Sequence, residues 1–284
     1  MERNPSAFLK EEYEELVRNN FDWKLRILET GSSPHSVVDG KEVIMLCSNN
    51  YLNLSNHSRI IKEAMDAAKK FGAGSGSVRA IAGTMKLHME VEKRLAKFKG
   101  TESSLIYQTG FAANAGLIPQ LVGKGDIIIS DELNHGSIID GVRLTKADRA
   151  VYKHCDVGEL EKALKDADKK YNRILVITDG VFSMDGDVSP MDKIVDVAVE
   201  YGAMTYVDDA HGEGVIGVSL CPVSNPILFN SFLKYFVLSQ RFLTCSGSVS
   251  NTSIAASCAP ATAGGCDPLS NQVLDLFKAK FTRS

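Results

Sequence analysis

The sequence predicts an α/β fold in which a mostly parallel sheet is flanked by helices. Short apolar strands alternate with helices through the middle of the chain, and connections of that length favour parallel strands with right-handed crossovers. The 284 residues are 44% hydrophobic, which is enough to bury a sizeable core. Because ligands of such sheets bind beyond the carboxyl ends of the strands, we expect the functional site there.

The first hundred residues predict three helices and one strand. An amphipathic, charged helix is expected over residues 8–17, and a short apolar strand over 43–47. A second helix should run over 58–70 with Ser58 as its N-cap. The third should run over 87–98 and end at Gly100, because glycine commonly terminates helices.

From residue 104 the strands and helices alternate regularly. Asp156 and Glu159 form a capping-box pattern, and Ser189 with Pro190 is typical of a helix start. The expected strands cover residues 104–107, 127–129, 174–178 and 203–207, and the helices cover 112–121, 137–144, 160–167 and a segment beginning at 190.

The composition changes abruptly after Gly217. Only seven of the 67 Lys, Arg, Asp and Glu side chains lie beyond it, whereas four of the six cysteines do. We therefore expect an N-terminal helix and strand segment over residues 1–50 and an incomplete large domain over 51–217. Residues 218–284 are expected to be an atypical tail, either disordered or translated out of frame.

Charge and hydropathy exclude several partners. A net charge of −3 lacks the basic excess that phosphate backbones require, so we expect no nucleic acid partner. Residues 1–20 contain no apolar core of a signal peptide, and the apolar stretches are far shorter than the roughly 20 residues of a membrane span. We expect a cytoplasmic protein without membrane contact, with reduced cysteines and no metal site.

Polar segments follow four predicted strands and should converge on one cleft. Gly110 and Phe111 lie at a strand-to-helix turn, which can bind a phosphate or be a plain turn. His135 could lie flat on an aromatic cofactor or be an ordinary surface or core histidine. Ser183 could donate a hydrogen bond to a cofactor or close a turn.

Asp208 carries a stronger signal because it ends an apolar strand. Burying a carboxylate there is costly unless a cation meets it, and a pyridinium nitrogen would be such a cation. His211 could then hydrogen-bond the phenolic oxygen of the same ring. Metal ligation or a capped turn is the weaker alternative, because no third ligand is nearby in the sequence.

Six motifs together resemble the α-oxoamine synthase family, in the usual order of that family. They read SNNYL at 48–52, GSGSVR at 74–79, IAGT at 81–84, DELNH at 131–135, TDGVFSMDG at 178–186 and DDAH at 208–211. The resemblance runs from about residue 8 to Gly217. It implies a pyridoxal-phosphate enzyme whose large domain is present and whose C-terminal small domain is missing.

The resemblance also implies residue roles. His135, Asp208 and His211 would be the catalytic residues, with His135 stacked on the ring of pyridoxal 5′-phosphate and Asp208 at its nitrogen. Ser183 and His211 would bond its oxygen, and Gly110 and Phe111 would serve its phosphate. Asn49 or Asn50 would face the amino-acid substrate.

The activity that the resemblance implies is that of glycine C-acetyltransferase, which joins glycine and acetyl-CoA to give 2-amino-3-oxobutyrate and CoA. An 8-amino-7-oxononanoate synthase is the alternative within the family, and members act as homodimers. A third possibility is a non-catalytic partner subunit of a family heterodimer. Retention of His135, Asp208 and His211 argues against that last possibility.

The main departure from the family pattern concerns a lysine. Family members hold the cofactor on a lysine that follows the aspartate–histidine motif, and the window expected to contain it has Gln240 instead. Lys234 lacks the flanking pattern and is a weak substitute, and Arg283 does not replace the missing substrate arginine. Asn53 stands where the family usually has glycine. A replaced 3′ portion would explain these features together, and the chain as written would then be inactive.

Overall fold

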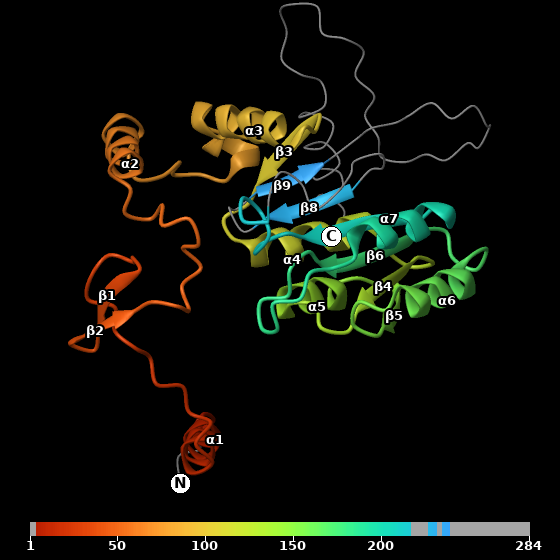
Figure 1. Cartoon of the computed structure of the whole chain (residues 1–284), viewed down its shortest axis with the longest axis horizontal. Helices are drawn as coiled ribbons and strands as arrows, with labels where there is room; N and C mark the ends of the chain where they lie inside the picture. Colours follow the sequence, from red (N-terminus) through yellow and green to blue (C-terminus); the bar gives the residue numbers. More distant parts are fainter. Residues whose placement is uncertain (1–3, 217–226, 232–234, 239–284) are drawn as a thin grey trace, which may run out of the picture. The chain divides into compact units, whose positions relative to one another are not determined.

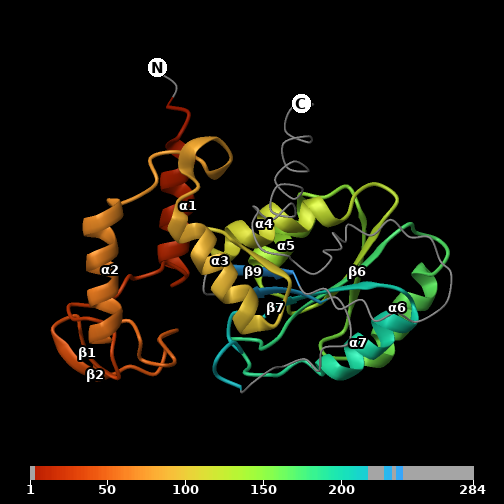
Figure 2. The same cartoon turned by 90° about the horizontal axis from the view of Figure 1, so that it is seen from above.

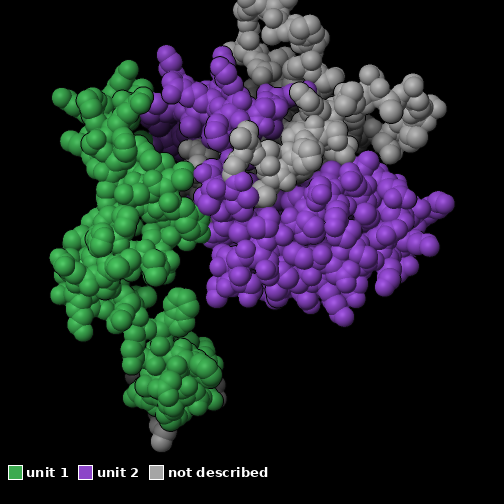
Figure 3. Space-filling view, in the orientation of Figure 1, with its two compact units in different colours: residues 1–74 green, residues 75–284 purple. Residues whose placement is uncertain are grey.

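The computed structural model describes residues 4–216, 227–231 and 235–238. The chain divides into two compact units, Met1–Gly74 and Ser75–Ser284, which Figure 3 colours separately. The predicted boundary at residue 50 remains a prediction. Among the described residues, no helix combines the length and the apolar character that crossing a bilayer would take.

The first unit contains two helices and a β-hairpin. Helix α1 spans Ala7–Arg18, and strands β1 (His35–Val38) and β2 (Lys41–Ile44) pair antiparallel. Helix α2 spans Ser58–Phe71 and has His57, not Ser58, as its N-cap. Strand β2 thus begins and ends earlier than the strand expected over 43–47. The turn at Asp39 and Gly40, both with positive φ, sets where β2 begins and how it pairs with β1.

The second unit begins with a π-helical turn, η1 (Arg79–Gly83), and helix α3 (Lys86–Lys99). Helix α3 ends as predicted at Gly100, which adopts the left-handed conformation with φ of 68°. The sheet follows, in the strand order β3-β9-β8-β7-β6-β4-β5. Its strands are β3 (Ser103–Ile106), β4 (Ile127–Asp131), β5 (Asp148–Tyr152), β6 (Ile174–Asp179), β7 (Met204–Asp208), β8 (Ile227–Ser231) and β9 (Tyr235–Leu238).

The predicted α/β fold is confirmed. Strands β8, β7, β6, β4 and β5 run parallel, and β9 pairs antiparallel with both β3 and β8. Figure 2 shows α6 and α7 on one side of the sheet and α4 and α5 on the other. These helices span α4 (Gly110–Leu121), α5 (Gly136–Arg143), α6 (Val157–Ala167) and α7 (Met191–Glu200).

Alternate residues of each central strand form two hydrophobic cores. On β6, Ile174 and Val176 pack with Leu160 and Leu164 of α6, whereas Leu175 and Ile177 belong to the core beneath α4 and α5. Strand β6 is buried along its whole length, as its continuous apolar run predicts. Helices α4 and α5 approach closely at Gly141, where a Cβ atom would lie 2.8 Å from the carbonyl oxygen of Asn114.

Four of the described strands lie where the sequence analysis expected none. Strand β1 is short and belongs to the hairpin, and β5 is an edge strand with one fully buried residue, Tyr152, so neither carries a clear apolar pattern. Strands β8 and β9 lie beyond Gly217, so the sheet continues into the segment expected to be an atypical tail. The rest of that expectation falls outside the described residues.

Candidate active site

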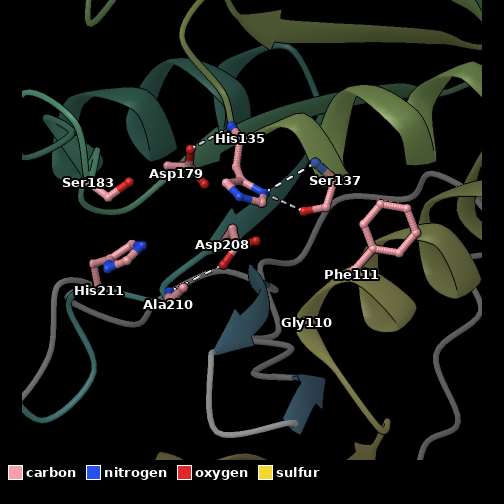
Figure 4. A pocket seen from close by; sticks show the side chains of 9 residues that line it. All are labelled: Gly110, Phe111, His135, Ser137, Asp179, Ser183, Asp208, Ala210 and His211. Atoms are coloured by element: carbon pink, nitrogen blue, oxygen red, sulfur yellow. Dashed lines mark hydrogen bonds between the residues drawn. The ribbon is translucent and has the colours of Figure 1, made fainter. Parts of the chain in front are cut away.

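A pocket lies at the carboxyl edge of the parallel strands, where the fold places ligand sites. Figure 4 shows the side chains around it. It is lined by Gly110, Phe111, His135, Ser137, Asp179, Ser183, Asp208, Ala210 and His211. Six of these nine residues are the cofactor-site candidates of the sequence analysis, so the fold brings that whole set together.

The N-terminus of α4 forms one end of the pocket. Thr109 caps this helix: its side-chain oxygen accepts a hydrogen bond from the Ala112 N–H at 3.0 Å. The next residues, Gly110 and Phe111, line the pocket with the first turn of a twelve-residue helix. The backbone N–H groups of the first turn point out of a helix at its N-terminus, and together with the helix dipole they make such a helix start favourable for an anion such as a phosphate.

His135 lies at the start of α5 and its ring is held from one side. Its Nδ1 accepts a hydrogen bond from the Ser137 N–H at 3.2 Å and lies 2.6 Å from the Ser137 Oγ. The backbone N–H of His135 donates to Asp179 Oδ2 at 2.8 Å. These contacts fix the ring at the wall of the pocket.

Asp208 ends β7 and is 6% exposed. Its Oδ2 accepts from the Asn114 side chain at 2.9 Å, and its Oδ1 accepts from the Ala210 N–H at 3.2 Å. Asn114 is itself oriented by the Tyr206 hydroxyl, which donates to its Oδ1 at 2.6 Å. Burial raises the pKa of Asp208, and the hydrogen bonds from Asn114 and Ala210 oppose that shift.

Asp179 lies directly beside Asp208 in the sheet. The two residues are register partners on the parallel strands β6 and β7. Burial, followed by the charge of Asp208, raises the pKa of Asp179 to about 8, while the His135 N–H lowers it. Two neighbouring buried carboxylates disfavour each other's ionisation, so the floor of the pocket favours a positively charged ligand atom.

Ser183 and His211 lie on the side of the pocket opposite Phe111 (Figure 4). Ser183 belongs to the loop between β6 and α7, and His211 follows β7. Burial is the main cause that lowers the pKa of His211, so its ring favours the neutral form. Both side chains can donate a hydrogen bond to an oxygen on this side of a ligand.

This donor set fits pyridoxal phosphate. The α4 N-terminus suits its phosphate, the paired carboxylates suit its protonated ring nitrogen, and Ser183 and His211 suit its phenolic oxygen.

The loop after β7 is also held by an ion pair. Asp209 is 4% exposed, and its Oδ2 lies 3.9 Å from the Nζ of Lys99 at the end of α3. Lys99 also contacts the Glu213 carboxylate. Burial raises the pKa of Asp209 to about 7, and the nearby Lys99 charge lowers it.

Two predicted residues belong to the first unit instead. Asn50 closes a local turn: its Oδ1 accepts from the Leu54 N–H at 2.9 Å, and its Nδ2 donates to the Ser32 carbonyl at 3.1 Å. Asn49 is exposed. A role for either residue in binding an amino acid remains a prediction. Lys234, Gln240 and Arg283 lie outside the described residues.

Sequence reasoning did not assign roles to Asn114, Ser137 or Asp179. Asn114 orients Asp208 across 94 positions of the chain, a pairing that no local pattern reveals. Asp179 stands at the end of the buried strand β6, as Asp208 does on β7, and that parallel position was the available signal.

Comparison with known proteins gives a family match. The model for aminotransferase class I and II matches residues 41–258. The matched region includes every residue that lines the pocket.

Three curated relatives illustrate the similarity to enzymes of one kind. The 8-amino-7-oxononanoate synthase of Thermoanaerobacter pseudethanolicus is 54% identical over 212 residues, which cover 75% of this chain and 54% of the relative. The enzymes of that name from Alkaliphilus metalliredigens and Bacillus velezensis (8-amino-7-oxononanoate synthase 1) are 53% and 50% identical over 210 residues, 74% of this chain and 53% and 54% of the relatives. The chain thus spans about half the length of these relatives.

Solved structures give the same fold. Serine palmitoyltransferase from S. paucimobilis, with pyridoxal phosphate and myriocin bound, matches with a TM-score of 0.73 and 32% identity, covering 83% of this chain and 65% of that one. The enzyme from Sphingomonas wittichii matches with a TM-score of 0.72 and 30% identity, covering 83% and 63%.

The curated relatives overturn one expectation. The sequence analysis expected glycine C-acetyltransferase activity, but relatives at 50% to 54% identity are 8-amino-7-oxononanoate synthases. Three of the six motifs used for that expectation, at 131–135, 178–186 and 208–211, supply residues of the pocket, and none of the six distinguishes one acyl donor or amino acid from another.

Proposed function

This chain belongs to the aminotransferase class I and II family and, within it, to the α-oxoamine synthases, and we propose that it carries the cofactor-binding part of an 8-amino-7-oxononanoate synthase. The observation that carries the proposal is identity of 50% to 54% with enzymes of that name across about 210 residues. The serine palmitoyltransferase structures are 30% to 32% identical, so they support the fold and the cofactor more than the substrate.

The name of the product defines the reaction. 8-Amino-7-oxononanoate carries a ketone beside an amine-bearing carbon, and the bond between these two carbons joins a seven-carbon acyl group to a two-carbon amine. Alanine that loses its carboxylate as carbon dioxide supplies the amine part. A thioester of a seven-carbon dicarboxylic acid supplies the acyl part and releases its thiol.

Bound pyridoxal phosphate supplies an electron sink for the carbanion that such a condensation needs. Asp208 would hold the proton at the ring nitrogen, which keeps the ring electron-withdrawing. His135 would stack on the ring, with Ser137 preventing its rotation. The α4 N-terminus would bind the phosphate, and Ser183 and His211 would hydrogen-bond the ring oxygen.

Partners and location follow as proposals. Alanine and an acyl thioester would be the substrates, a homodimer would be the assembly, and the cytoplasm would be the location. Lys234 lies outside the described residues, so no step is assigned to it.

A cofactor titration tests the assignment of the pocket. We expect the purified chain to bind pyridoxal phosphate with a shifted visible absorbance and induced circular dichroism. Asp208→Asn, which keeps the size of the side chain but removes its charge, should weaken binding at least about tenfold, the equivalent of roughly 1.4 kcal/mol. Binding of the same strength in this variant would contradict the role of Asp208.

A second measurement tests the substrate. Alanine should perturb the spectrum of the bound cofactor more strongly than glycine or serine, and a response to serine alone would favour the chemistry of the structural neighbours. Borohydride reduction followed by peptide mapping then asks whether Lys234 holds the cofactor. A defined adduct there would make the chain an active enzyme with a displaced lysine.

A further inference from the structure

A second cluster of titratable side chains lies outside the pocket, at the same edge of the sheet. His154 follows β5, and its ring lies between two carboxylates. Its Nδ1 is 3.1 Å from Asp131 Oδ1, and its Nε2 is 3.2 Å from Asp187 Oδ2. Only the charged imidazolium can donate from both nitrogens at once, so this arrangement favours protonated His154.

One of the two carboxylates belongs to the loop that carries Ser183. This loop, residues 180–189, is closed by the Phe182 N–H, which donates to the Asp187 carbonyl at 2.9 Å, and by the Gly186 N–H, which donates to the Phe182 carbonyl at 2.8 Å. Phe182 is 3% exposed, and its ring meets the His154 ring edge-on with centroids 4.3 Å apart. His154 therefore contacts the base of the loop twice, next to Ser183.

The cluster is organised around a proton rather than a metal ion. Ligand atoms of Asp131, His154 and Cys155 lie within 4.8 Å of one another. However, Asp131 Oδ1 already accepts from the Leu133 N–H and Oδ2 from the Cys155 N–H, both at 2.9 Å. Burial, then the charges of Asp131 and Asp187, raise the pKa of Cys155 to about 11, so it remains a thiol and a poor metal ligand.

We propose that His154 is a positioning residue whose charged form fixes the loop 180–189 and so holds Ser183 at the pocket. The inference rests on the proposed function, because the role given to Ser183 is toward the cofactor. Nothing in this role requires His154 to contact the cofactor, and the pocket lining does not include it.

The surroundings of His154 favour its charged form. Burial lowers its pKa, but the hydrogen bond and charge of Asp131, and then those of Asp187, raise it overall. Two further carboxylates and one cation lie nearby. The Glu132 carboxylate accepts the backbone N–H of His154 at 2.9 Å, and Glu159 of α6 accepts the backbone N–H of Lys153. The Lys153 ammonium is paired with Glu159 at 3.7 Å, and Cys155 is a neutral thiol. Stabilisation by His154 is therefore complete below about pH 6.5 and lost as the pH rises through its raised pKa.

Hydrogen exchange of the chain without cofactor tests the proposal directly. The reporters are the amides of Phe182 and Gly186, with the amides of β6 as the internal reference. Two variants probe the contact between His154 and Asp187. His154→Gln cannot carry a charge, and Asp187→Asn keeps a hydrogen-bond acceptor but loses the charge on the loop. The control is His35→Gln, which changes an exposed histidine in the first unit.

We expect the reporter amides of His154→Gln to exchange at least about tenfold faster than those of the unmodified chain at pH 6, with β6 unchanged. In the unmodified chain the same amides should lose protection between pH 6 and pH 9, after correction for intrinsic rates, and this pH dependence should disappear in the variant. Unchanged reporters in His154→Gln would overturn the proposal. If the β6 amides also lose protection in His154→Gln, the Asp187→Asn variant decides. Faster exchange of its reporter amides with unchanged β6 amides supports the proposal, and unchanged exchange of its reporter amides overturns it.

A cofactor titration of the same samples separates this inference from the proposed function. Weaker binding of pyridoxal phosphate by His154→Gln, with His35→Gln unchanged, would support the link to Ser183. Equal affinity despite a loosened loop would overturn that link. If the unmodified chain does not bind pyridoxal phosphate, the proposed function fails, while the exchange result still decides whether His154 fixes the loop.

Discussion

Helices α6 and α1 differ in what covers their apolar faces, although similar periodic sequences predict both. In α6, Leu160 and Leu164 are fully buried against the sheet. In α1, Leu9 and Leu16 are 55% and 46% exposed, and neither α1 nor α2 contains a buried residue. Periodicity thus indicates a helix and its apolar side, whereas the packing that stabilises the helix comes from the rest of the fold.

Two ion pairs, one from each unit, differ in their exposure to solvent. Lys62 and Asp66 of α2 form a pair whose side chains are 71% and 59% exposed. Lys99 and Glu213 of the second unit form a pair whose side chains are 14% and 13% exposed. Exposed pairs contribute little because water and salt screen them, whereas removal of one partner from a buried pair leaves a charge without compensation.

The largest expected effect comes from Leu164→Ala in α6. The change removes a fully buried side chain and leaves a cavity, so we expect the free energy of unfolding of the second unit to fall by about 3 kcal/mol. Urea unfolding followed by far-ultraviolet circular dichroism measures it. A loss below about 1 kcal/mol would mean that this core is packed less tightly than the structure shows.

Lys99→Met should have the next largest effect. The apolar stem is retained but Asp209 and Glu213 lose their nearby cation, and we expect a loss of about 2 kcal/mol in the free energy of unfolding. Lys62→Met, at the exposed pair of the first unit, is the matched control and should change stability by less than about 0.5 kcal/mol. Equal effects of the two substitutions would contradict the expected difference between the buried and the exposed ion pair.

Asp179→Asn should alter the pH dependence of stability. The pKa of Asp179 is raised to about 8, so its protonated form stabilises the fold below the ordinary aspartate pKa of about 4, and this stabilisation is lost as the pH rises to about 8. The asparagine stays neutral and keeps an acceptor for the His135 N–H. We expect the cofactor-free variant to be more stable at pH 8 by about 1 kcal/mol and to show a flatter stability profile from pH 4 to pH 8.

Leu16→Ala in α1 should have the smallest effect. Its side chain is 46% exposed, and alanine favours helix formation, so we expect a change within about 0.5 kcal/mol in thermal unfolding. Losses as large as those of Leu164→Ala would show that the apolar face of α1 is covered when the protein is in solution.

Much of the fold follows from local sequence. Gly100 ends α3 in the left-handed conformation, the continuous apolar run of β6 is buried throughout, and the Asp156 side chain caps α6 by accepting from the Glu159 N–H at 3.0 Å. The capping box is only half formed, because the Glu159 carboxylate accepts from the Lys153 N–H instead. Strand β5 escaped prediction because it is an edge strand with exposed polar residues at its start.

The site is predictable in part for a different reason. Residues that follow parallel strands meet at one edge whatever their spacing, so His135, Ser183 and Asp208 could be grouped before the structure was known. The contacts that hold these residues in place could not be predicted from the sequence. Asn114 reaches Asp208 from the interior of α4, and His154 reaches Asp187 across 33 positions, because the arrangement of strands in the sheet brings them together.

The close approach of α4 and α5 at Gly141 has a consequence for how a ligand arrives. The N-terminus of α4 and His135 at the start of α5 both line the pocket, and at Gly141 the two helices pack so closely that a Cβ atom would meet the Asn114 carbonyl oxygen and the Ile118 side chain at 2.8 Å. We therefore expect the two helices to move as one piece. Pyridoxal phosphate would thus meet a preorganised half-site, and its association would show a single kinetic phase without a slow closing step from these two helices.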